Sequence, residues 1–200
     1  MKTIKTILAT AIVVVAAGCS SVTGLKNFTE CKFKFHSVSD VKLGAIDLSD
    51  KKSYKNLKLT DIAQLMAGYA KKELMLNMNI NMKVKNPNDQ AAQLDGMDYI
   101  LWIDDQEMLE GTMKEKVKIE ANTEDKVALP ITLNMYDAIK DKKLEPMAEF
   151  AFGLATDNAD ASRVKVSIKP FFTFGKDTVK FPSYITIGGD QIMPKRKSAQ

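Results

Sequence analysis

The sequence predicts a mostly β domain of antiparallel strands with two helices. In residues 74–84, apolar side chains occupy every second position, and from residue 77 on asparagines or lysines fill the gaps. This is the period of a strand with one buried and one solvated face. Similar alternating segments recur along the chain between short polar turns, as in antiparallel sheets. Two other segments space their apolar residues as a helix does.

Length and composition indicate one folded domain and argue against nucleic-acid binding. Of the 200 residues, 45% are hydrophobic and 27% are charged, as in ordinary globular proteins. The formal charge is +4, but Lys2 and Lys5 lie in a segment that we expect to be removed. Only Arg163 and Arg196 are arginines, and arginine is the usual reader of bases and phosphates. We therefore expect no nucleic-acid partner.

The N-terminus has the features of a secretory signal. Two lysines precede an apolar segment, residues 7–17, that is too short to span a bilayer. Residues 16–19, AAGC, resemble a bacterial lipobox, although alanine stands where the pattern prefers leucine. The resemblance implies a lipoprotein signal peptide over residues 1–18, cleavage before Cys19 and acylation of its sulfur. The alternative is an ordinary secretory signal with a coincidental cysteine.

A mature chain of this kind begins with an acylated tether, residues 19–30, which reaches at most roughly 35 Å when extended. The folded domain, residues 31–188, then lies close to the membrane, which is its partner through the lipid on Cys19. Serine rather than aspartate follows this cysteine, which by family analogy indicates a lipid-anchored protein of the bacterial outer membrane that faces the periplasm. We expect residues 189–200 to be a basic, disordered tail. Acylation leaves Cys31 without a disulfide partner, as a small buried residue.

The chain before the long alternating segment supplies two strands and a helix. Residues 31–35 alternate, and residues 41–48 predict a second strand that is interrupted at Gly44. A helix is predicted over residues 60–72, with Thr60 as its N-cap and one apolar stripe that faces the core. The stripe consists of Ile62, Leu65, Met66, Tyr69 and Ala70.

The turn residues Asn86, Pro87 and Asn88 end the long strand. Proline lacks the N–H that a sheet ladder needs, and asparagine favours turns. Three further strands joined by short turns follow, and Pro130 marks the third as an edge strand or the site of a bulge. A second helix and a final hairpin complete the domain. The strands span residues 94–103, 108–121 and 126–136, the helix 144–155, and the hairpin 163–174 with 178–187.

The order of short motifs after the long strand identifies a family resemblance. Asn86-Pro87-Asn88 is followed by Ala91-Ala92, by Leu94-Asp95-Gly96 and by an aromatic strand through Tyr99. A spaced valine–isoleucine strand and residues 127–131, VALPI, come next. This order, over residues 74–136, resembles the late embryogenesis abundant type 2 family, also called the water stress and hypersensitive response (WHy) domain, and more loosely its bacterial lipoprotein branch.

The resemblance implies an immunoglobulin- or fibronectin III-like antiparallel β-sandwich with an accessory helix. It also implies a link to desiccation and stress tolerance, without catalytic residues. We therefore expect a membrane-anchored, non-enzymatic lipoprotein that acts as a stress-protective or protein-interaction module. Its physiological partner, whether protein, glycan or lipid, is not specified by any residue.

Residue types suited to catalysis or metal binding are sparse. His36 is the only histidine and lies in the first predicted strand, where a structural or exposed role is expected. One acidic pair has no base partner for acid–base chemistry. One acidic cluster at a hairpin lacks the spacing of a calcium loop. We expect no enzyme activity, no metal and no cofactor. The acidic residues considered are Asp95 and Asp98 for the pair, and Asp104, Asp105 and Glu107 for the cluster.

Two features leave alternative functions open. Asn77, Asn79 and Asn81 form a polar ladder, which is either a solvated sheet face or a face that contacts water, glycan or a protein partner. Several of the eleven methionines lie on the apolar faces of strands. They either fill an ordinary core or line the groove of a lipid or hydrophobic-ligand carrier. The carrier requires an open seam between the sheets, whereas the protective module has a closed core. The seam would be lined by Met78, Met82, Met97, Met113 and Phe171-Phe172.

Overall fold

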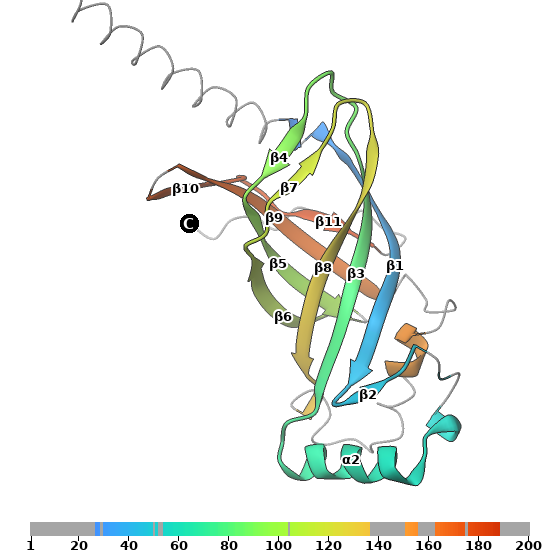
Figure 1. Ribbon diagram of the computed structural model, residues 1–200. Helices are drawn as coiled ribbons and strands as arrows, with labels where there is room; N and C mark the ends of the chain where they lie inside the picture. Colours follow the sequence, from blue (N-terminus) through green and yellow to red (C-terminus); the bar gives the residue numbers. More distant parts are fainter. Residues whose placement is uncertain are drawn as a thin grey trace, which may run out of the picture.

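Antiparallel strands make up most of the part of the chain that the structure describes. The computed structural model describes residues 27–28, 30–49, 51, 54–103, 105–136, 151–155, 163–174 and 176–188. The strands form two larger sheets that pack against each other and a third, two-stranded sheet near one end (Figure 1). A single longer helix, α2, lies across the opposite end of the described structure.

The first larger sheet, here the β3 sheet, has the strand order β2-β1-β3-β8. β1 spans Lys32–Leu43, β2 Ile46–Asp47, β3 Met75–Lys85 and β8 Glu124–Asn134. β8 pairs with β3 along the whole length of β3, and β1 pairs with its other side. The prediction that this alternating segment is a central strand is therefore confirmed.

The second larger sheet, here the β5 sheet, has the order β10-β9-β5-β6, and β11 also pairs with β9. Its strands are β5 (Gly96–Ile103), β6 (Gln106–Met113), β9 (Val164–Phe174), β10 (Asp177–Lys180) and β11 (Ile185–Ile187). β10 and β11 pair with different parts of β9, so the second strand of the predicted final hairpin is interrupted.

The small sheet consists of β4 (Ala92–Leu94) and β7 (Val117–Ile119). The predicted strands 94–103 and 108–121 are each divided between this sheet and the β5 sheet, which is a correction. Gly96, the first residue of β5, lies at the first of these divisions and is packed too closely for a side chain. A Cβ there would lie 2.4 Å from the Met113 carbonyl oxygen and 2.5 Å from the Phe171 ring, so only glycine allows this close packing.

These sheets confirm the predicted fold class, a mostly β, antiparallel β-sandwich with few helices. The chain passes from one larger sheet to the other and back, as in immunoglobulin-like sandwiches. β1, β3 and β8 lie in one sheet, whereas β5, β6 and β9 lie in the other.

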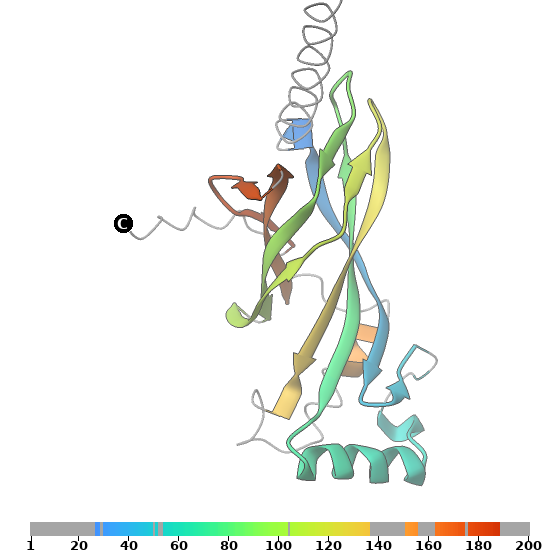
Figure 2. The ribbon, with the colours of Figure 1, turned by 60° about the vertical axis from the view of Figure 1, so that its left-hand side comes forward.

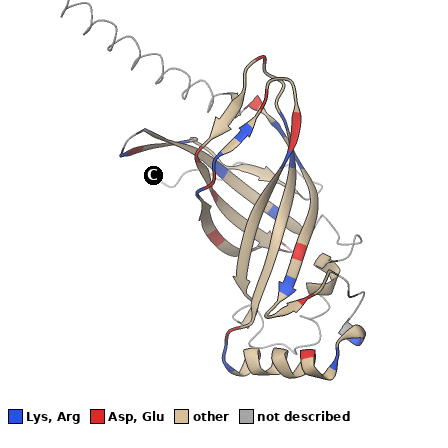
Figure 3. Cartoon of the chain, in the orientation of Figure 1, with Lys and Arg blue, Asp and Glu red and all other residues tan. Residues whose placement is uncertain are grey.

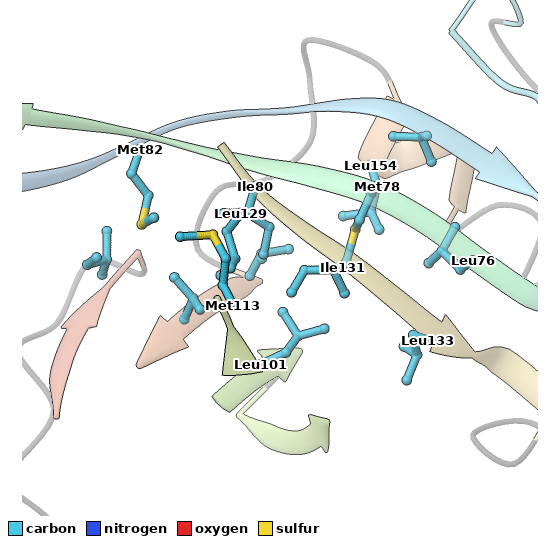
Figure 4. Packing of buried hydrophobic residues seen from close by; sticks show 14 of the residues in the cluster. Leu76, Met78, Ile80, Met82, Leu101, Met113, Leu129, Ile131, Leu133 and Leu154 are labelled. Atoms are coloured by element: carbon cyan, nitrogen blue, oxygen red, sulfur yellow. The ribbon is translucent and has the colours of Figure 1, made fainter. Parts of the chain in front are cut away.

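The core lies between the two larger sheets and is built by the period of two. Alternate residues of β3 and β8 are buried, and their neighbours are partly or fully exposed. Figure 4 shows side chains of β3 and β8 packed against those of the β5 sheet. The labelled members include Leu76, Met78, Ile80 and Met82 of β3, Leu129, Ile131 and Leu133 of β8, Leu101 of β5 and Met113 of β6.

The first part of the sandwich differs from the two strands predicted at residues 31–35 and 41–48. β1 is one strand of 12 residues whose register against β3 shifts after Phe35 and after Ser39. These irregularities add unpaired residues, which interrupt the alternation in the sequence. The predicted interruption at Gly44 is confirmed, since Gly44 has a φ of 60° and separates β1 from β2.

Helix α2 spans Leu59–Ala70, and two predictions about it are wrong. Thr60 lies inside the helix rather than at its N-cap, and the Lys58 backbone N–H donates to the Asp61 carboxylate at 3.0 Å. Of the predicted apolar stripe, only Leu65 is buried, while Ile62 is 43% and Met66 54% exposed. Figures 1 and 2 show the reason, because α2 crosses the end of the sandwich rather than lying along a sheet.

Several predictions lie wholly or partly outside the described residues. The signal peptide, most of the tether and the tail at residues 189–200 belong to this group. In the predicted second helix, residues 151–155 are helical, and residues 144–150 are not described. Among the described residues, no helix is both long and apolar enough to span a membrane.

Two substitutions on α2 test how it contacts the sandwich. Leu65→Ala is expected to lower the free energy of unfolding by about 2–4 kcal/mol, because this side chain is 3% exposed and packs in the core. Ile62→Ala, one turn earlier and exposed, is expected to change it by less than about 1 kcal/mol. Urea unfolding followed by circular dichroism measures both. Equal losses of unfolding free energy for the two variants would contradict the exposed position of Ile62.

Candidate functional site

The side chain of Asn86 is the most extensively bonded polar group among the described residues. It is 0% exposed. The carbonyl oxygens of Gln90, Glu120 and Ile119 lie 2.9, 3.1 and 3.2 Å from its Nδ2. Its Oδ1 accepts hydrogen bonds from the backbone N–H of Asn88 at 3.0 Å and from the Asn88 side chain at 2.9 Å. One amide therefore joins the segment after β3 to the segment after β7.

Asn88 extends this network to the beginning of the described chain. Its Nδ2 donates to the Asn27 carbonyl oxygen at 2.9 Å, and its own carbonyl accepts from the Asn122 N–H at 3.0 Å. The Asn27 side chain in turn donates to the Ala91 carbonyl at 3.4 Å. We call Asn27, Asn86 and Asn88 the asparagine hub. It fixes the position of the N-terminal segment before β1.

The hub has a structural role for a physical reason. Burying an amide without partners costs several kcal/mol, and every donor and acceptor contact of Asn86 is to another part of the chain. In the described part of the protein, no buried side-chain nitrogen or oxygen is without a partner. The hub thus holds together the segments after β3 and after β7 and the segment before β1.

The asparagine ladder of β3 lies on the outer face of the β3 sheet, partly exposed. Asn81 donates to the hydroxyls of Ser37 and Ser39 at 3.1 and 3.0 Å. Asn79 donates to the Asp40 carboxylate at 2.8 Å, and Asn77 accepts from the Thr132 hydroxyl at 2.8 Å. The ladder is therefore ordered across three strands by its own side chains, and the identity of any partner for this face stays a prediction.

The two aspartates considered for acid–base chemistry are each held by a lysine. Asp95 lies 3.5 Å from Lys116 and accepts the backbone N–H of Thr173 at 2.9 Å. Asp98 lies 2.6 Å from Lys180 and accepts the Thr112 hydroxyl at 2.9 Å. The Asp98 carboxylate therefore connects strands of the β5 sheet, whereas Asp95 connects the residue before β5 to the segment before β7 and to β9.

The other candidate chemical residues are not gathered in one place. His36 is exposed, at the register shift of β1. Asp105 forms an ion pair with Lys165, whose side chain is largely buried on β9. Asp104 lies outside the described residues. Among the residues that the structure describes, no group of three histidines, cysteines or acids could hold a metal ion.

Cys31 is a free, buried cysteine, and Cys19 lies outside the described residues. The Cys31 thiol donates a hydrogen bond to the Asn27 carbonyl oxygen at 3.4 Å. Burial, with a contribution from the nearby Glu30 carboxylate, raises the pKa of Cys31 to about 11. The protonated thiol is a poor nucleophile, so Cys31 acts at neutral pH as a packing residue next to the hub.

The methionines that a carrier groove would require are enclosed in the core. Met78, Met82, Met97 and Met113 are at most 6% exposed. Figure 4 shows Met78, Met82 and Met113 among leucine and isoleucine side chains between the sheets. Phe171 and Phe172 are each 8% exposed. The four methionines belong to the packed core cluster of the described residues, whereas the two phenylalanines are buried outside that cluster.

Sequence reasoning missed two sets of residues. Asn27 lies in the segment that the sequence predicts as a tether, although the aromatic Phe28 interrupts the polar character of that segment. The lysines of β1 and β3 were treated only as polar partners of apolar neighbours. Their equal spacing with the outward asparagines predicts that they share one face of the sheet. The outward lysines are Lys32 and Lys34 on β1, and Lys83 and Lys85 on β3.

Comparison with known families and structures gives one family match. The family model described as late embryogenesis abundant protein, LEA_2, matches residues 81–185. This range runs from the middle of β3 to the start of β11. It therefore includes the turn Asn86-Pro87-Asn88, β8 and most of the β5 sheet, but not β1 or β2. Among curated proteins, no sequence matches this chain.

Two solved structures are similar over most of the chain. A crystal structure of a protein from Archaeoglobus fulgidus has 13% identity and a TM-score of 0.33, covering 80% of this chain and 100% of its own. A solution structure described as a late embryogenesis abundant (LEA) protein has 13% identity and a TM-score of 0.38, covering 97% of this chain and 91% of its own.

Asn86→Ala tests the hub. We expect the free energy of unfolding to fall by about 2–4 kcal/mol, because the substitution removes the amide and leaves buried carbonyl groups without donors. The matched control is Asn79→Ala on the exposed ladder, with an expected loss below about 1 kcal/mol. Urea unfolding followed by the fluorescence of Trp102, the only tryptophan, measures both. A loss for Asn86→Ala no larger than that of the control would contradict the structural role.

Proposed function

Because this chain belongs to the late embryogenesis abundant type 2 family, we propose that it is a membrane-anchored, non-enzymatic protein with a stress-protective or protein-interaction role in the periplasm. The proposal includes the WHy domain and the bacterial lipoprotein branch of the family. It also includes acylation of Cys19 and a position on the outer membrane.

The proposal rests on the contacts that the described polar side chains make within the fold. The buried amide of Asn86 holds loops, the carboxylates of Asp95 and Asp98 hold strands, and the asparagine ladder orders a sheet surface. None of these groups is combined with the single histidine, which is exposed on β1. An outer surface that is ordered by its own hydrogen bonds is suited to binding or protection rather than to catalysis.

The anchor gives the domain a defined orientation under this proposal. Asn88 holds Asn27, so the free tether between Cys19 and the fold is residues 20–26. Seven residues reach at most roughly 25 Å. The asparagine hub then faces the membrane, and α2, at the opposite end of the sandwich (Figure 2), lies farther from it.

The two cysteines allow a matched test of the anchor. After growth with an alkyne analogue of palmitate, we expect the wild-type protein and Cys31→Ser to carry the label and Cys19→Ser to lack it, because only Cys19 has a lipobox before it. In-gel fluorescence of the purified protein measures incorporation. An unlabelled wild-type protein would contradict the lipoprotein assignment, and a labelled Cys19→Ser protein would move the acylation elsewhere.

Survival of a deletion strain tests the protective role. We expect lower viability than wild type after drying or hyperosmotic shock, and equal growth without stress. Expression of the wild-type chain should restore survival, whereas expression of Cys19→Ser should not, because the domain loses its membrane location. Colony counts after stress measure the effect. Wild-type survival of the deletion strain in both conditions would argue against a protective function and leave a protein-interaction role.

A further inference from the structure

Five lysines occupy neighbouring positions on the outer face of the β3 sheet. Lys32 pairs with Lys85, Lys34 pairs with Lys83, and Lys83 also pairs with Lys126 of β8. Directly paired residues point to the same side of a sheet, with Cβ atoms roughly 5 Å apart. We call this set, Lys32, Lys34, Lys83, Lys85 and Lys126, the lysine face.

The lysine face is unfavourable for folding. Like charges directly opposite each other on neighbouring strands destabilise a sheet, and two rows of this surface have lysine opposite lysine. Lys32, Lys34, Lys85 and Lys126 are exposed, and Lys83 is half-buried. Paired lysines that destabilise the sheet at several positions indicate a role in binding.

Acidic residues on the same face compensate these charges only in part. Glu124 is opposite Lys85 and lies 3.8 Å from the Lys83 ammonium group. It is the one acid that the register of β1, β3 and β8 places among these lysines. Asp125 follows it, paired with the buried Val84, and accepts the backbone N–H of Lys126. Figure 3 shows charges of both signs around this end of the domain, but the paired outward positions of β1, β3 and β8 here are the five lysines and Glu124.

The lysine face adjoins the point where the tether joins the fold. Lys85 directly precedes Asn86 of the asparagine hub, and Lys32 directly follows Cys31. The hub holds Asn27 through Asn88. With a free tether of residues 20–26, the face can come within one Debye length of the bilayer, about 10 Å at 0.1 M salt.

We propose that the lysine face binds the anionic headgroups of the phospholipid membrane in which the protein is anchored. This inference rests on the proposed acylation of Cys19 for its location, but its chemistry depends only on the folded domain. Clustered lysines next to a lipid anchor strengthen membrane binding by electrostatic attraction. The lysine end of this outer face, next to the asparagine hub, is then directed at the bilayer surface, and the asparagine ladder extends away from it toward α2.

The test uses a chain that begins at Ser20 and carries no lipid. Every described strand and helix lies beyond residue 26, so this chain keeps all of them. Co-sedimentation with phosphatidylcholine vesicles is compared with co-sedimentation with vesicles in which phosphatidylglycerol makes up about a third of the lipid. We expect binding to the anionic vesicles only, and its loss at high salt because exposed charges are screened.

Two triple variants locate the binding. Lys34→Gln, Lys83→Gln and Lys126→Gln together should weaken binding to anionic vesicles roughly 10- to 100-fold. The matched control removes the same charge from the α2 end with Lys55→Gln, Lys58→Gln and Lys71→Gln, and should bind almost as the parent chain does. Circular dichroism confirms that both variants fold.

Three outcomes would overturn the proposal. They are equal binding to neutral and anionic vesicles, no binding to either, and equal loss in the two triple variants. The last result would mean that net charge, not this face, attracts the membrane. Because the chain in this test has no lipid, its outcome is independent of the acylation experiment, and each proposal can fail without the other.

Discussion

The rest of the sandwich depends on the buried amide of Asn86. The chain leaves the β3 sheet directly after this residue and returns to it after β7, through the turn at residues 120–123 that the amide also contacts. The crossing after β3 and the return before β8 are therefore fixed at one point. A hydrophobic contact could not do this, because the groups to be satisfied are backbone carbonyls that are removed from water.

The same constraint connects the fold to its N-terminal segment. Asn88 is held by Asn86 and in turn holds the Asn27 carbonyl, so the segment before β1 is positioned by the turn after β3. Cys31 and Phe28 are buried beside it. A tether that joins the domain at such a point limits how the domain can rotate relative to its anchor. Orientation at the membrane is then a consequence of hydrogen bonds inside the fold.

The sequence predicted the strands well where one side of the chain faces the core and the other faces water. β3 and β8 follow from this alternation alone, because each residue class goes to one face over eleven positions. The divisions at β4–β5 and β6–β7 could not be predicted in this way. The alternation of apolar and polar residues does not indicate which sheet a strand joins. The close packing of Phe171 against Gly96 at the start of β5 brings together residues that are distant in sequence. The prediction of a buried α2 stripe was wrong for a related reason, since periodicity identifies a face but not the surface that covers it.

Prediction of the candidate site had the same limit. Asn86-Pro87-Asn88 predicts a turn from residue types, whereas the depth of Asn86 depends on carbonyls more than thirty residues away.

The two ends of the sandwich are chemically different, and this difference constrains any functional model. The hub end has a satisfied amide network and adjoins outward lysines that oppose one another. The α2 end exposes apolar side chains, including Leu59 at 83% and Met66 at 54%. A protein free in solution would gain stability from removing the paired lysines and from covering the apolar helix. For a tethered protein the two ends meet different surroundings, because the tether holds only one of them near the lipid. Under the proposed lipid anchor, the end with unbalanced positive charge is the one nearer the bilayer. Anionic headgroups there would compensate the repulsion between lysines that Glu124 relieves only in part.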